Sequence, residues 1–179
     1  MFSRFFKIRS KNLPKIISTK KCGEFTLSLK YLVSRDGELH WLRDGELQRS
    51  DKVESEFIRY GQSEKLSGKE WIGFHPPKKG KVTPELWADQ IDSEYLDLIS
   101  SWGEILSNDS DKLQNLLDEY NIQVYCLNTL IGNLKLSGVK IISGGENEMI
   151  FGPAEEFPSF DLSLVIGKDK TVSSVSFDG

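Results

Sequence analysis

TPELWADQIDSEYLDLISSWGEIL, residues 83–106, is the stretch that decides the fold of this chain. It opens with a threonine that can cap a helix, a proline at the first helical position and an acid in the first turn. Apolar residues then recur at spacings of three and four, namely Trp87, Ile91, Tyr95, Leu98, Trp102, Ile105 and Leu106. This spacing predicts a long helix with one apolar face against a core.

The residues after this helix predict a shorter helix and then a sheet. Asn108-Asp109-Ser110-Asp111 restarts a helical pattern, with Leu113, Leu116, Leu117 and Tyr120 on one side. Apolar runs follow at 124–127, 134–142, 149–151, 160–166 and 172–177. Gly144-Gly145 and the stretch 167–170 punctuate them as hairpin turns, which predicts an antiparallel sheet on which both helices pack.

The N-terminal half has the pattern of short strands. Alternating apolar residues from Phe25 to Val33 predict one half-buried strand. The pentapeptide Arg35–Leu39 recurs as Arg43–Leu47, and Asp-Gly in each copy favours a tight hairpin turn. We therefore expect an α+β fold with an N-terminal β-meander, two central helices and a C-terminal antiparallel β-sheet.

The middle of the chain has a weaker pattern. Residues 48–68 predict irregular structure or a short helix, and the prolines and glycines of 71–81 predict a linker. A length of 179 residues suits a single domain, 1–179. A subdivision within it is an N-terminal β lobe, 22–75, and a helix-plus-sheet lobe, 83–179, preceded by a basic lead, 1–21.

Charge is sorted by position along the chain. The first 21 residues hold seven Lys and Arg and no acid, whereas the other 158 hold 16 basic and 27 acidic residues, a net charge of −11. An acidic body argues against direct nucleic-acid binding, because neutralising phosphates supplies most of that affinity, and it suits capture of a basic protein. The basic lead has three open interpretations: an organelle presequence, a peripheral contact with an anionic membrane, or a first element packed on the domain.

The sequence contains few groups that indicate chemistry. Cys22 and Cys126 have no disulfide-framework or metal-ligand spacing, and no apolar run is long enough to span a membrane, so a cytoplasmic protein without a metal or cofactor is expected. His40 and His75 lie in no catalytic motif. A small hydrolase is the alternative function: it would use His75, Cys126 or a pair of carboxylates, and Cys126 could pair with His75 or His40, because catalytic partners need not be close in sequence.

Several charged spots could bind a partner. Asp36, Glu38, Asp44 and Glu46 surround Trp41 in the two predicted turns, and this is the leading candidate surface, because a Trp inside a charged rim is typical of binding hot spots. Glu155 and Glu156 form a second acidic spot before Phe157, and Asp89, Asp92, Glu94 and Asp97 lie on the long predicted helix. Lys78, Lys79 and Lys81 precede that helix, where a phosphate could bind, although a solvated linker is the simpler interpretation.

The C-terminal half resembles a group of small bacterial proteins of unknown or immunity function that are encoded beside polymorphic and contact-dependent growth-inhibition toxins. The resemblance rests on Trp102, Leu134-Lys135-Leu136, Met149-Ile150-Phe151-Gly152, Phe157 and Val175-Ser176-Phe177-Asp178-Gly179. It implies a cytoplasmic immunity protein without catalysis of its own that covers the active site of one toxin. Since a nuclease must be basic where it grips nucleic acid, the leading hypothesis is an immunity protein against a basic nuclease toxin.

Overall fold

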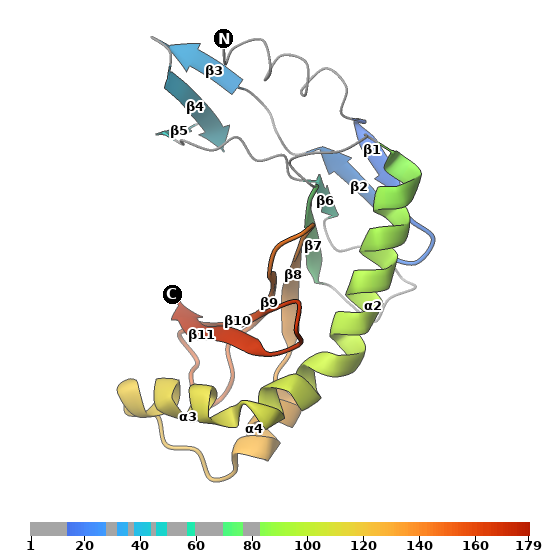
Figure 1. Cartoon of the computed structure of the whole chain (residues 1–179). Helices are drawn as coiled ribbons and strands as arrows, with labels where there is room; N and C mark the ends of the chain where they lie inside the picture. The colour runs from blue at the N-terminus through green and yellow to red at the C-terminus, as the bar shows by residue number, and fades with distance from the viewer. Residues whose placement is uncertain are drawn as a thin grey trace.

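The computed structural model has an eight-stranded sheet with helices on one face, and a separate three-stranded sheet (Figure 1). It describes residues 14–27, 32–35, 38–43, 46–49, 57–59, 70–76 and 83–179; within 32–59 the description is of the backbone. Mixed helices and largely antiparallel strands confirm the expected α+β class.

The long helix begins where the sequence predicts. Helix α2 spans Pro84–Asn108 with Thr83 at its N-cap, although the Thr83 side chain makes no capping hydrogen bond. Helix α3 follows at Ser110–Glu119. A third helix, α4, spans Leu127–Asn133. The prediction of a strand at 124–127 is therefore wrong: residues 124–126 form a loop, and Leu127 begins α4.

The four C-terminal strands form the predicted hairpins. They are β8 Leu136–Ile142, β9 Asn147–Phe151, β10 Asp161–Ile166 and β11 Val172–Asp178. All three neighbouring pairs are antiparallel, with β-bulges between Leu136 and Gly138 and between Val165 and Ile166. The turns at 143–146 and 167–171 join them, and Gly144 has a φ of 77°, which glycine adopts at low cost.

Strands from the N-terminal half extend this same sheet. They are β1 Ile16–Ser18, β2 Glu24–Leu27, β6 Phe57–Arg59 and β7 Trp71–His75, and the complete order is β1-β2-β6-β7-β8-β9-β10-β11. The expected linker at 71–81 is thus wrong for residues 71–75, because β7 pairs in parallel with β8 inside the sheet. The sheet is antiparallel except for this pair.

The meander is present as a second sheet. Strands β3 Leu32–Arg35, β4 Glu38–Arg43 and β5 Glu46–Arg49 pair antiparallel, and each connection is two residues long. The single strand expected from Phe25 to Val33 is instead divided between β2 of the large sheet and β3 of the small one. Irregular structure or helix was expected throughout 48–68, but β6 lies there.

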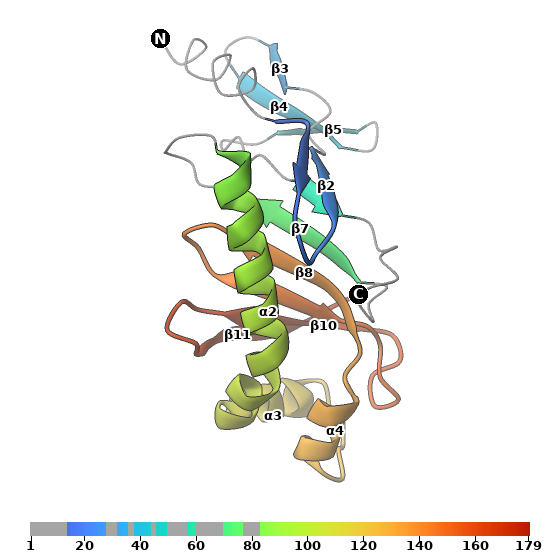
Figure 2. The same ribbon diagram turned by 90° about the vertical axis from the view of Figure 1, so that its right-hand side faces the viewer.

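The core lies between the large sheet and its helices. Helix α2 crosses one face of the sheet, and α3 and α4 lie at its lower end in the view of Figure 2. Phe74 of β7 packs on Trp87 at 6.0 Å between ring centroids, and Trp102 packs on Phe151 of β9 at 4.6 Å. None of the described helices covers the opposite face.

Candidate partner-binding surface

The acid excess of the protein is concentrated in the helices. Residues 83–134, which contain α2, α3 and α4, hold ten acidic residues and one lysine, a net charge of −9. The other 106 residues after position 21 carry a net charge of only −2. Because α2 packs on one face of the large sheet and α3 and α4 lie at its end, most of the net negative charge of the body belongs to these helices.

Most of these acids face solvent. Seven of the ten are exposed: Glu85, Asp89, Asp97, Glu104, Asp111, Asp118 and Glu119. Asp92 is buried, and Glu94 and Asp109 are half-buried. Of the four acids that the sequence placed together on the long helix, only Asp89 and Asp97 are therefore available on the surface.

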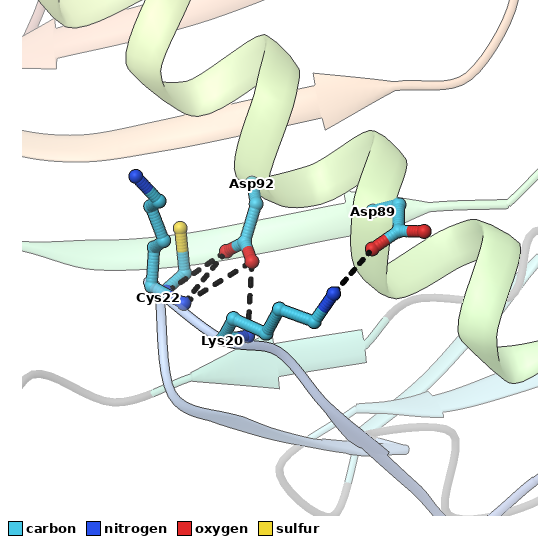
Figure 3. Close-up of polar contacts among 5 residues, drawn as sticks. Lys20, Cys22, Asp89 and Asp92 are labelled. Atoms are coloured by element: carbon cyan, nitrogen blue, oxygen red, sulfur yellow. Dashed lines mark hydrogen bonds and ion pairs between the residues drawn. The ribbon is translucent and has the colours of Figure 1, made fainter.

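Asp92 ties the first hairpin to α2. Its carboxylate accepts backbone N–H groups from Lys20, Lys21 and Cys22 at 2.9–3.2 Å (Figure 3). The amide of Cys22 also donates to the Thr19 hydroxyl at 2.9 Å. A cradle of consecutive amides is a typical anion site, and here the anion is a side chain of the protein itself, so Asp92 is structural.

Glu94 has a comparable structural role at the β8–β9 turn. Its carboxylate accepts from the side chains of Gln90 at 2.7 Å and Asn147 at 3.1 Å. Gln90 also contacts Ser143, and Asn147 accepts the amide of Ile142. These bonds hold the hairpin turn against α2.

Asp109 binds the sheet instead of capping α3. Asp109 is the N-cap residue of α3, but its side chain makes no hydrogen bond to that helix. Its carboxylate accepts the amide of Val172 at 2.8 Å, and Lys112 donates to the Val172 carbonyl. The two side chains thereby satisfy the backbone at the start of edge strand β11.

Exposed large apolar side chains gather on the helical side as well. The described residues contain six: Ile16, Leu86, Leu96, Ile99, Tyr120 and Tyr125. Five of these six lie within 83–126, on α2 or on the segment that connects α3 to α4. The helical side therefore presents both acidic and large apolar side chains to solvent.

The two predicted turns around Trp41 lie largely outside the described residues. Asp36 and Asp44 are not described, and Glu38, Trp41 and Glu46 are placed by backbone alone, on β4 and β5. The acidic-rim hypothesis for these five residues therefore stays a prediction. Glu155 and Glu156 are the central residues of a tight turn closed by the amide of Phe157, which donates to Ala154 O at 3.1 Å.

The residues considered for catalysis lie on separate elements. His75 pairs with Ile142 at the end of β8, whereas Cys126 precedes α4, which leads into the start of β8. His40 lies on β4 of the small sheet. The fold therefore places no described pair of these residues on neighbouring strands. The lysines considered for phosphate binding, Lys78, Lys79 and Lys81, lie outside the described residues.

A polar cluster that the sequence did not reveal lies on the sheet face opposite the helices. Glu148 accepts hydrogen bonds from Lys140 at 2.7 Å and from the buried hydroxyl of Ser163 at 2.6 Å. Burial alone would raise the pKa of Glu148, but these bonds and the nearby charge of Lys140 hold it below its ordinary value. No sequence pattern links Lys140, Glu148 and Ser163, because they come from three different strands.

The fold and this surface define an α+β protein whose helices present acidic and some large apolar side chains to solvent. No described helix is long and apolar enough to cross a membrane, and no described group of His, Cys, Asp and Glu could hold a metal ion. Comparisons of the chain with protein-family models, curated proteins and solved structures find no match.

Proposed function

We propose that this protein is a cytoplasmic immunity protein that binds and neutralises a cognate bacterial toxin, a basic nuclease, through its acidic helical layer. The observation that carries the proposal is the concentration of net charge −9 in residues 83–134, which contain α2, α3 and α4. The protein covers the basic surface with which the toxin grips nucleic acid, and it performs no catalysis of its own.

The physical support is electrostatic complementarity. Nucleases need a positively charged surface to bind phosphates, so an acidic face attracts that surface and accelerates encounter. Charge alone discriminates poorly between basic partners. Apolar contacts would add discrimination by shape, and the exposed side chains that could make them are Leu86, Leu96, Ile99, Tyr120 and Tyr125. The helical layer has both kinds of group, which the net charge of the whole chain does not reveal.

The test uses the full chain as bait in a lysate of its native host. The captured protein is then purified, and its nuclease activity is titrated with the bait. We expect a basic protein that is inhibited at one equivalent and whose association slows steeply with added salt. Capture of no stoichiometric partner, or of a partner whose activity is unchanged, would contradict the proposal and favour a search for hydrolase activity.

A further inference from the structure

The two edges of the large sheet differ in length and in protection. Strand β11, Val172–Asp178, is the outermost strand at the C-terminal end (Figure 1), and no described strand pairs with its outer side. The other edge strand, β1, has only three residues, and Pro14 and Lys15 directly precede it. Short length, proline and lysine are devices that keep an edge strand from pairing with another chain, so the β1 edge is protected.

Strand β11 has comparable protection only at its start. Apart from β10, the described residues that hydrogen-bond to its backbone are Asp109 and Lys112, and both bind Val172. Residues 174–178 contain no proline and no basic residue. Backbone N–H and C=O groups along an unprotected edge are a template for a further strand, so this part of β11 can accept one.

The sequence of residues 174–178 is complementary to itself. Because side chains alternate between the faces of a strand, Val175 and Phe177 are half-buried on the helix face. Ser174, Ser176 and Asp178 are exposed on the opposite face. An antiparallel pair centred on Ser176 places Val175 opposite Phe177 of a second copy, and it places Ser174 opposite Asp178 of that copy. The first pair is apolar, and in the second a hydroxyl can donate to a carboxylate, so both favour the pairing.

We infer that residues 174–178 bind the same segment of a second copy of this chain, which joins two large sheets into one across a two-fold axis. The inference is independent of the proposed function. A two-fold axis requires a surface that is complementary to itself, and the register centred on Ser176 meets this requirement. The only charge in the segment, that of Asp178, then faces a serine and not a second carboxylate.

The first experiment measures the mass of the full chain by sedimentation equilibrium as a function of concentration and salt. We expect a reversible dimer that strengthens with added salt, because each copy carries a net charge of −4 and salt screens the repulsion between copies. Binding to a basic toxin should instead weaken with salt, so the two associations differ in the sign of their salt dependence. A chain that stays monomeric at about 1 mM in high salt would overturn the inference and leave the proposed function intact.

Two charge-matched variants then test the register. S176K places two introduced ammonium groups directly opposite each other in the dimer, whereas S174K places each of them opposite Asp178 of the other copy. Both serines are exposed on the same face of β11, so both variants keep the pairing with β10 and change the net charge equally. We expect S176K to weaken the dimer about fivefold, and S174K to leave it unchanged or to strengthen it up to about fivefold. Equal effects of the two variants, or a dimer that neither variant changes, would place the contact elsewhere and overturn the inference.

Discussion

Substitution of Asp92 by Asn should destabilise the protein more than neutralisation of any other single acid in the helices. Asp92 is 8% exposed and accepts three backbone N–H groups, whereas Asn keeps one acceptor oxygen and turns its amide group toward those donors. Hydrogen bonds to a charged group contribute about 1.5–3 kcal/mol each when buried.

The net loss is smaller than the sum of three such bonds. Lys20 and Lys21 are exposed, so water can satisfy their amides, and the amide of Cys22 keeps the Thr19 hydroxyl as a partner. We therefore expect D92N to lower the free energy of unfolding by about 2 kcal/mol. For a chain of this size, that corresponds to a fall in Tm of about 4–8 °C.

The assay is urea and thermal unfolding followed by tryptophan fluorescence, together with amide hydrogen exchange. Exchange should accelerate at residues 20–22 in D92N, because these amides lose their acceptor. D89N is the matched control: Asp89 is exposed and lies 3.8 Å from an exposed Lys20, so its loss should change stability by less than about 0.5 kcal/mol. Equal destabilisation by the two variants would refute the structural role of Asp92.

Three further predictions concern other sites. Because the pKa of Glu148 is depressed in the folded protein, its carboxylate stabilises the fold above the ordinary glutamate pKa, and this stabilisation is lost as pH falls. The difference in unfolding free energy between E148Q and the parent should therefore shrink between about pH 6 and pH 3. A constant difference would contradict this. Hydrogen bonds from Thr129 lower the pKa of the exposed Cys126 thiol, so T129V should slow its alkylation by iodoacetamide, with the buried second cysteine as the unlabelled reference; an unchanged rate would argue against the bond. A Cβ at Gly138 would overlap the indole of Trp71, so G138A should cost about 1–3 kcal/mol in urea unfolding and shift tryptophan emission, and a neutral effect would show that the ring moves freely.

Local signals in the sequence predicted the elements whose structure is decided locally. Thr83-Pro84-Glu85 located the start of α2, and the Asp-Gly pairs located the hairpins of the small sheet. These signals work because caps and tight turns depend on the backbone preferences of a few neighbouring residues. The C-terminal hairpins were predictable for the same reason, because their turns also depend on a few neighbouring residues.

Pairings between distant segments left no comparable signal. Trp71–His75 was expected to be a linker because prolines follow it, yet it is a buried strand whose parallel partner begins at Leu136. Parallel pairing needs a crossover, here α2, α3 and α4, so nothing near 71–75 in the sequence records it. The division of 24–35 between two sheets escaped prediction for the same reason.

The negative charge of the candidate surface was predictable from the sequence, but its location on the fold was not. The sequence showed an acidic body, but spacing alone could not reveal that Asp92 turns inward to amides 70 or more positions earlier, whereas Asp118 and Glu119 stay in water. Burial separates acids that serve the fold from acids that can serve a partner. The acidic rim around Trp41, the leading candidate from the sequence, remains a separate prediction.

The positions of the cations explain why the exposed acids of the helical layer should act differently. Lys20, which follows β1, and Lys170, in the β10–β11 turn, lie against the carboxylates of Asp89 and Asp97, so the middle of α2 is screened by the protein's own charges. The only lysine of the described helices, Lys112, donates to the backbone of β11 and lies seven residues before Glu119. Among the described residues, Glu104, Asp111 and Glu119 have no such cation, so removal of their charge should slow association with a basic partner more than removal of the charge of Asp89 or Asp97.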